Sequence, residues 1–179
     1  ALHRAGAPAF GAPWPGFIGT LPQDNTPTDG AWAEWFARRR LLPYLRRSVD
    51  TGALDPADAA LVERVLAALP GCGGDEPPAR IHGDLWPGNV LWGADGRPWL
   101  VDPAAHGGHR ETDLAQLHLF GGAPHLDRIL AAYQEVWPLA DGWTARRPVH
   151  ELHLLLVHTA LFGAAYRHAV LAAARAAPH

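Results

Sequence analysis

Residues 81–92 of this 179-residue chain read IHGDLWPGNVLW, and this stretch decides the fold and the function that we predict. Asn89 is the fifth residue after Asp84, and a second acidic residue, Asp102, follows further along the chain. Two short apolar runs on either side of the turn sequence GADGR predict a β-hairpin between Asn89 and Asp102. Such a hairpin would bring Asn89, at its entry, near Asp102, at its exit.

This arrangement suits the transfer of a phosphoryl group. Transfer from ATP needs an acceptor hydroxyl held in line and a divalent metal that offsets the charge of the phosphates. Asp84 would accept the proton of the hydroxyl, while Asn89 and Asp102, as hard oxygen ligands, would hold Mg²⁺. Asp-Gly, Gly-Asn and Asp-Pro are also frequent in turns, so the Asp-to-Asn spacing alone leaves a purely structural explanation open. The hairpin, with His82 in front of it and Asp102 behind, favours the catalytic explanation.

Composition argues against several other classes of protein. The net charge is −3 and all 15 basic residues are arginines, which argues against a nucleic-acid partner. The arginines at 38–40 lie in a helical pattern and predict a solvated, salt-bridged face. Cys72 is the only cysteine, which fits a reducing cytoplasm, and with Ser48 as the only serine no serine-hydrolase motif exists. No apolar run approaches the ~20 residues that span a bilayer, so we expect no membrane partner.

The rest of the chain predicts a mainly α-helical fold with a small β-hairpin. We expect one domain, residues 1–179, in four segments: an arm or loop (1–28), helices (29–69), the catalytic loop and metal hairpin (79–103), and a helical remainder (111–179). Asp29 is expected to cap the first helix and Pro43 to interrupt it. Asp55 precedes a proline and should cap the next helix, and the last helical stretch should divide near Gly163.

Four stretches resemble the fructosamine kinase (ketosamine-3-kinase) family, which shares a protein-kinase-like fold with aminoglycoside and choline phosphotransferases. They are HGDLWPGN at 82–89, VDPA at 101–104, GHRETDLA at 108–115 and LFGG at 119–122. The pattern HGDxxxxN is shared across that superfamily. The Leu-Trp pair within it, and the stretch GHRETDLA, point to the fructosamine kinase branch, and the resemblance runs over nearly the whole chain.

The resemblance implies a role for individual residues. It implies that Asp84 is the catalytic base and that Asn89 and Asp102 are the metal ligands. It also implies that Asp113 is a buried carboxylate that supports the catalytic loop, while His82 shapes the turn that presents the base.

Three further residues are candidates for contact with the substrate. Trp86 lies on the loop beside the base, where its ring could form one wall of a sugar-amine pocket or belong to the core. His106 and Arg110 follow the second metal ligand and could reach the acceptor or the phosphates. A structural role in that loop is equally open for each.

The resemblance implies a kinase that uses ATP and Mg²⁺ to phosphorylate a ketosamine, a sugar attached to an amine or to a protein lysine, as a repair of glycation. Aminoglycosides or amino alcohols are alternative acceptors, and a non-catalytic binding module is an alternative of another class. Family members carry an N-terminal lobe with a lysine that pairs with the phosphates, but this chain has no lysine or methionine. We therefore expect the C-terminal lobe alone, a fragment or processed product, with little activity by itself and with self-association through its exposed cleft face.

Overall fold

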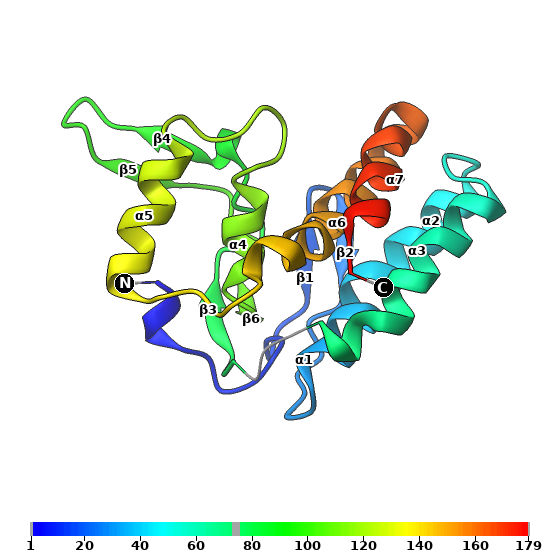
Figure 1. The fold of residues 1–179 in the computed structure, drawn as a ribbon, viewed down its shortest axis with the longest axis horizontal. Helices are drawn as coiled ribbons and strands as arrows, with labels where there is room; N and C mark the ends of the chain where they lie inside the picture. The colour runs from blue at the N-terminus through cyan, green and yellow to red at the C-terminus, as the bar shows by residue number, and fades with distance from the viewer. Residues whose placement is uncertain (1, 73–75, 179) are drawn as a thin grey trace.

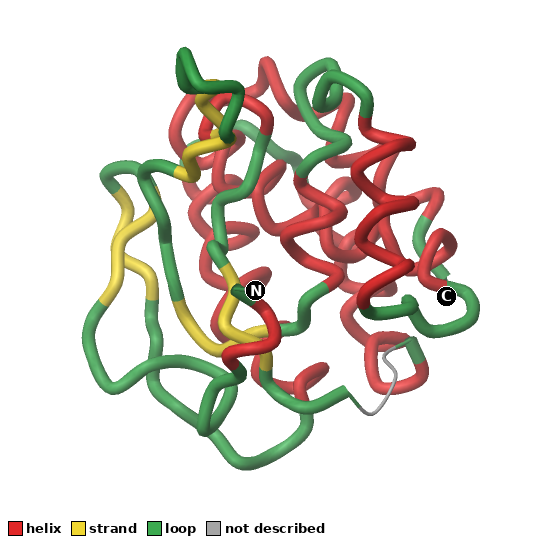
Figure 2. Tube along the Cα trace, turned by 90° about the vertical axis from the view of Figure 1, so that its left-hand side faces the viewer, coloured by secondary structure: helices red, strands yellow, loops and turns green. Residues whose placement is uncertain are grey.

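The computed structural model describes residues 2–72 and 76–178 (Figure 1). Within these residues, the chain forms seven α-helices and three antiparallel strand pairs. The helices are α1 (Trp32–Phe36), α2 (Leu42–Asp50), α3 (Pro56–Ala68), α4 (Glu111–Gln116), α5 (Leu126–Val136), α6 (Trp143–Phe162) and α7 (Arg167–Ala176). The strands are β1 (Gly16–Ile18), β2 (Leu21–Gln23), β3 (Ala79–Ile81), β4 (Val90–Trp92), β5 (Pro98–Leu100) and β6 (His106–Gly108). Short helical turns are η1 (His3–Ala5), the π-helical η2 (Ala37–Leu41), η3 (Leu69–Gly71), η4 (Pro87–Asn89) and η5 (Gly163–Tyr166). Figure 2 shows the helices gathered on one side of the molecule and the strands and long loops on the other.

The centre of the core is α6, which contacts α2, α4 and α7. Its leucines at 152, 154 and 156 are fully buried. The stretch Trp143–Ala176, which joins α6 to α7, is long and apolar enough by composition to cross a membrane. It divides at Gly163, as predicted, and the apolar side chains of α6 pack against neighbouring helices. The core accounts for the buried part of this stretch, which includes the leucines named above.

The predicted interruption near Pro43 takes the form of the π-helical turn η2 (Ala37–Leu41). Proline lacks an N–H and crowds the carbonyl one turn before it, so a wider turn there lets the helical path continue into α2. Asp29 does not cap α1, because the residue at that cap is Ala31. The prediction was correct for α3, where Asp55 accepts hydrogen bonds from the amides of Ala57 and Asp58.

The predicted hairpin is the pair β4–β5, in which Val90 lies opposite Leu100. Two further strand pairs were not predicted: β1–β2 lies in the segment expected to be an irregular arm, and β3 pairs with β6. The arm crosses β6 closely, because the amides of Gly11 and Gly107 each donate to the carbonyl of the other. A Cβ on Gly107 would lie 1.9 Å from the carbonyl oxygen of Ala9, so this crossing requires glycine.

Candidate active site

The loop that carries Asp84 is held from beneath by two side chains of α4. Asp113 is fully buried, and its carboxylate accepts hydrogen bonds from the amides of His82 (2.8 Å) and Gly83 (2.9 Å). Gln116 accepts a bond from the amide of Leu85 at 2.7 Å and donates to the carbonyl of Gly83 at 3.2 Å. Asp113 thus lies beneath the loop that carries Asp84 and binds two of its backbone amides.

His82 and Gly83 fix the conformation of the turn before Asp84. The Nδ1 atom of His82 accepts a bond from the amide of Asp84 (3.3 Å), so Nε2 carries the proton that is donated to the carbonyl of Val101 (3.0 Å). This bond ties the loop to the residue before Asp102. Gly83 has φ +82°, and a Cβ there would lie 2.4 Å from a backbone oxygen, so only glycine fits.

Asp84 and Asn89 face one another across the loop. The Nδ2 atom of Asn89 donates to the backbone oxygen of Asp84 at 2.9 Å and to its Oδ2 at 3.1 Å. Burial raises the pKa of Asp84 to about 7, against the opposing effect of the Asn89 hydrogen bond, and the charges of Asp102 and Asp113 raise it further. A carboxyl group that titrates near neutral pH is well matched to general-base chemistry.

The hairpin brings Asp102 to the same place as Asn89. The amide of Val101 donates to the carbonyl of Asn89 at 3.0 Å, so the two ends of the hairpin meet as predicted. Asp102 is exposed and has φ +54°, a sparsely populated conformation for a residue other than glycine. Within the described residues, neither its carboxylate nor Oδ1 of Asn89 accepts a hydrogen bond. These hard oxygen donors fit Mg²⁺.

Trp86 and the two other substrate candidates differ in their surroundings. Trp86 is partly buried, and its ring packs on Gly88 of the catalytic loop. His106 is buried, with Nδ1 2.8 Å from a backbone oxygen, while its Nε2 accepts a bond from Arg40 (3.3 Å). Arg110 is also buried and donates to both carboxylate oxygens of Glu76 at 2.6 Å. Their contacts favour the structural alternative for His106 and Arg110, so we carry only Trp86 forward.

Sequence analysis missed a histidine that reaches the catalytic loop from the start of the chain. His3 lies in η1, and its Nε2 is 2.9 Å from Oδ2 of Asp113, the same oxygen that accepts the amide of His82. Its Nδ1 is 2.8 Å from the hydroxyl of Tyr133 in α5. No local pattern marks His3, because its partners lie more than a hundred positions away in the sequence.

Sequence analysis also assigned Arg40 to a solvated face, and that prediction was wrong. Its side chain is fully buried over the ring of Trp35 and donates to Oδ1 of Asn25 (2.7 Å) and to His106. Burial lowers the pKa of Arg40 to about 9. Arg40 lies within the π-helical turn η2, and its bond to His106 supports the loop that follows Asp102.

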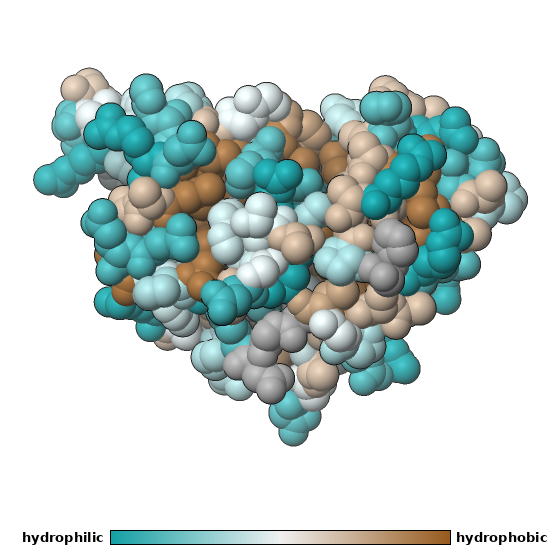
Figure 3. All heavy atoms as spheres, in the orientation of Figure 1, coloured by the Kyte–Doolittle hydropathy of each residue, from teal (hydrophilic) through white to brown (hydrophobic). Residues whose placement is uncertain are grey.

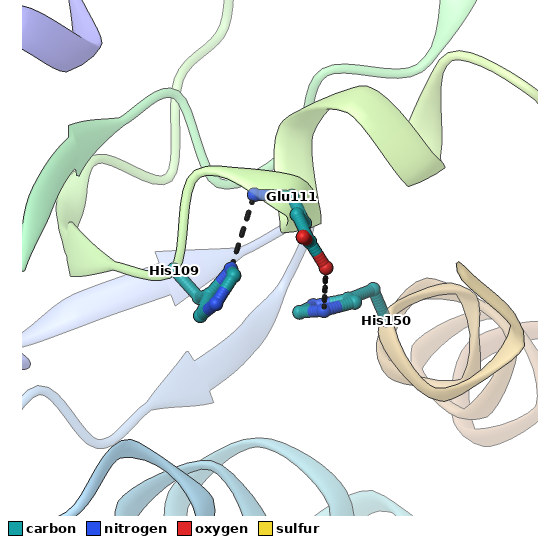
Figure 4. Close-up of side chains that lie close together, drawn as sticks. All are labelled: His109, Glu111 and His150. Carbon is teal, nitrogen blue, oxygen red and sulfur yellow. Dashed lines mark hydrogen bonds and ion pairs between the residues drawn. The ribbon is translucent and has the colours of Figure 1, made fainter. Parts of the chain in front are cut away.

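A second group of titratable side chains joins α4 to α6 (Figure 4). Donor atoms of His109, Glu111 and His150 lie within 4.8 Å of one another, as in a metal site. The Nδ1 atom of His109, however, accepts the amide of Glu111, so Nε2 carries the proton and has no lone pair for a metal. Arg146 already donates to both oxygens of Glu111, at 2.6 and 3.0 Å. Burial alone would raise the pKa of Glu111. The neighbouring side chains of His150 and Arg146 outweigh this effect and lower that pKa to about 2. We therefore interpret the group as a structural ion-pair cluster.

Comparison with known proteins places the chain among kinases. Residues 1–175 match the sequence pattern of the fructosamine kinase family. The chain belongs to this family. Among curated members, a probable ketoamine kinase of Enterococcus faecium is 36% identical over 173 residues, which are 92% of this chain and 59% of the relative. A probable ketoamine kinase of Thermus thermophilus is 38% identical over 167 residues, which are 93% of this chain and 59% of that protein.

Solved structures of fructosamine kinase relatives share the fold. A crystal structure named "putative fructosamine-3-kinase", from Thermobifida fusca, is 62% identical with a TM-score of 0.93 and covers 97% of this chain and 60% of that one. A protein of the same name from Haemophilus somnus has a TM-score of 0.85 at 24% identity, which shows the same fold. The chain therefore spans about 60% of the length of these relatives.

Proposed function

We propose that this chain is the C-terminal, catalytic lobe of an ATP-dependent kinase that phosphorylates a sugar hydroxyl of a ketosamine, such as a glycated protein lysine. The observation that supports this most strongly is the anchored loop that holds Asp84 against Asn89, with Asp102 beside them, in a chain of a kinase family. The product would be a phosphorylated ketosamine, and the reaction would serve the repair of glycation.

Asp84 is the base in this proposal. The acceptor oxygen would attack the γ-phosphorus of ATP while Asp84 accepts the proton of the hydroxyl, and the bond from the phosphorus to the ADP oxygen would break. Because the pKa of Asp84 is about 7, the group is partly deprotonated at neutral pH and holds a proton well once it has accepted one. The hydrogen bonds from Asn89 keep its carboxylate in one orientation.

Asn89 and Asp102 would hold the metal. When bound, Mg²⁺ would offset the negative charge of the ATP phosphates. The two polar atoms of the Asn89 side chain would have different roles. Nδ2 donates hydrogen bonds to Asp84. Oδ1 would therefore face away from the base and be free to bind the metal. Asp102 supplies a charged oxygen ligand from the other end of the hairpin.

We further propose that the phosphate-binding lysine and the nucleotide lobe belong to the part of a longer protein that this chain does not cover. The chain has no lysine, and its relatives extend well beyond it. Without that part ATP would be poorly positioned, so the chain by itself should turn over little. The cytoplasm, where ATP is abundant and Cys72 stays reduced, is the proposed location.

The proposal is tested by joining this chain to the part of the Thermobifida fusca protein that it does not match. We expect the fusion to transfer phosphate from ATP to a fructosamine, measured by mass spectrometry of the product. Asp84→Asn should lower kcat on the order of 10²- to 10⁴-fold, because the general base is lost. Asp95→Asn, in the exposed turn of the hairpin, is the matched control and should retain activity.

Two outcomes would contradict the proposal. Equal rates for the native fusion and for Asp84→Asn would exclude Asp84 as the base. A fusion that binds ATP and Mg²⁺ but phosphorylates neither the fructosamine nor an aminoglycoside or amino alcohol would favour a binding module. Phosphorylation of an aminoglycoside alone would keep the chemistry and change the acceptor.

A further inference from the structure

Five aromatic side chains form a continuous surface next to the catalytic loop, which we call the aromatic wall: Trp86, Phe120, His158, Phe162 and Tyr166. The ring of Phe120 lies 5.7 Å from Trp86 and 4.4 Å from His158, measured between centroids. The ring of Tyr166 lies 5.9 Å from Phe120, 5.0 Å from His158 and 6.0 Å from Phe162. The wall therefore begins two residues from Asp84 and extends to the end of α6.

The end of the wall nearest Asp84 is packed on two sides. A Cβ on Gly88 would lie 2.1 Å from the ring of Trp86, so the indole packs directly on the backbone of the catalytic loop. Its other side meets Phe120 edge to face, at an interplanar angle of 83°. Trp86 thus lies between the backbone of the loop and the ring of Phe120.

Phe120 is held outward by an unusual backbone. Its φ is +53°, a conformation that costs a non-glycine residue free energy, and Gly121 and Gly122 that follow it also have positive φ. Phe120 remains 38% exposed, and Phe162, at the end of α6, is 62% exposed. Burial does not account for these two rings. Phe120 contacts Trp86 of the loop, Phe162 is connected to it through His158 and Tyr166, and exposed aromatic rings of this kind indicate a ligand surface.

The polar atoms of the wall carry no positive charge at neutral pH. Nδ1 of His158 donates to the carbonyl of Leu154 at 2.8 Å, which leaves Nε2 as a hydrogen-bond acceptor. Burial lowers the pKa of His158, so the ring stays neutral. Within the described residues, the hydroxyl of Tyr166 makes no hydrogen bond. The wall thus offers ring faces, one acceptor nitrogen and one hydroxyl.

We propose that the aromatic wall binds the part of the acceptor that does not react: the protonated amine of a ketosamine and the carbon chain attached to it. This inference rests on the proposed function, because it assigns the wall to the substrate of the same site. Ring faces attract ammonium groups and pack against carbon chains. With the amine on Phe120 and Phe162, the sugar would extend along Trp86 towards Asp84.

The test measures equilibrium binding, without ATP, so that it is independent of phosphoryl transfer. The probes are fructosyl-lysine with its α-amine acetylated and its carboxyl group amidated, and the same molecule acetylated also on the linking nitrogen (the N-acetylated probe), which carries the same sugar without any positive charge. Phe162→Ala should raise the Kd for fructosyl-lysine about tenfold, as expected for the loss of one cation–π contact. The same change should leave the Kd of the N-acetylated probe within about twofold, since that probe has no charge to lose. Isothermal titration calorimetry measures both.

Two variants complete the design. Phe17→Ala is the matched control, because Phe17 is 65% exposed and lies on β1, outside the wall. It should leave both affinities unchanged. Tyr166→Phe removes only the hydroxyl and keeps the ring, so it should weaken fructosyl-lysine by a smaller factor than Phe162→Ala. Circular dichroism confirms that each variant is folded.

The inference is overturned if the two probes bind the native chain equally, or if Phe162→Ala and Phe17→Ala have the same effect. Failure of this inference differs from failure of the proposed function. If the fusion protein phosphorylates a fructosamine in an Asp84-dependent manner while Phe162→Ala leaves binding unchanged, only the aromatic wall has been assigned wrongly. If no acceptor is phosphorylated, the proposed function fails whatever the probes show.

Discussion

The catalytic loop (82–89) and the hairpin β4–β5 are neighbours in the sequence but are held in different ways. Half of the residues of the loop are buried, and side chains from distant parts of the chain bind its backbone, as Asp113 and Gln116 do. The hairpin that follows is exposed on both strands, with Trp92 59% and Trp99 62% exposed. Within the described residues, it is held mainly by its own strand pairing and turn.

This difference between the anchored loop and the exposed hairpin suggests that the proposed active site is completed in two steps. Among the described residues, Asp113 and Gln116 anchor the loop that carries Asp84, our proposed base. The hairpin and the apolar groove beside it, about 370 Å³ and lined by Leu100 and Val136 among others, leave apolar surface uncovered. Figure 3 shows apolar side chains at the surface near α5, in this part of the molecule. We propose that another part of a longer protein covers this surface.

The largest effect should follow from breaking the anchor of the loop with Asp113→Asn. The change replaces one carboxylate oxygen by an NH₂ group, which cannot accept from the amides of His82 or Gly83 or from His3. Buried donors left without an acceptor should lower the free energy of unfolding by about 3–5 kcal/mol. Urea denaturation measures the change. Asp127→Asn, on α5, is the control, and an equal loss from both variants would contradict the anchoring role.

The second effect is a loss of stability in mild acid, which arises around the buried site and not in the hairpin. Burial lowers the pKa of four buried histidines (His106, His109, His150 and His153). Below pH 6.5 the unfolded chain binds protons at these sites and the folded chain does not, so stability falls as the pH falls. Asp84 acts in the opposite direction, because its raised pKa lets the folded state hold a proton up to about pH 7.

Four groups outweigh one, so we expect a net loss of roughly 2–3 kcal/mol between pH 6.5 and 5.5. Urea denaturation across this range measures the slope. His153→Phe removes one titrating ring from a buried site next to Phe36 and Tyr44 and should flatten the slope by up to about 1.4 kcal/mol per pH unit. Stability that is constant between pH 7 and 5 would exclude this role for the histidines.

The third effect isolates the contact between the start of the chain and the loop. In His3→Gln the side-chain amide can take the place of Nε2 and still donate to Asp113, whereas the shorter side chain of His3→Asn cannot reach it. We expect His3→Asn to cost about 1–2 kcal/mol more than His3→Gln. Hydrogen exchange should show faster opening of the amides of His82 and Gly83 in His3→Asn alone. Equal exchange in the two variants would mean that His3 does not support the loop.

The contrast between the two regions also explains what the sequence could predict. The catalytic loop and the hairpin follow from local patterns: a fixed spacing between Asp84 and Asn89, and apolar runs around a turn. The pair β3–β6 has no such signal, because each strand has three residues and β6 reads His-Gly-Gly, which shows no alternation.

The missed residues have a different physical cause. His3 and Arg40 make their decisive contacts only after the chain has folded, because a π-helical turn or a distant helix brings the partner to them. His106 and Arg110 were read as substrate candidates because they follow Asp102 in the sequence. In the fold they point inward instead, where their polar atoms bind other parts of the chain.

Substitutions in the hairpin should have the smallest effect on the free energy of unfolding, in contrast to substitutions that break the anchor of the loop. Trp99→Ser removes an exposed ring, so the free energy of unfolding should change by no more than about 0.5 kcal/mol. The same change should reduce the self-association that we propose for the uncovered surface, measured by sedimentation velocity at several concentrations. Trp14→Ser, at 56% exposure on the arm, is the matched control and should leave the association unchanged. If Trp99→Ser destabilised the chain as much as Asp113→Asn, the hairpin would be as strongly held as the loop. The contrast between an anchored loop and an uncovered surface would then be wrong.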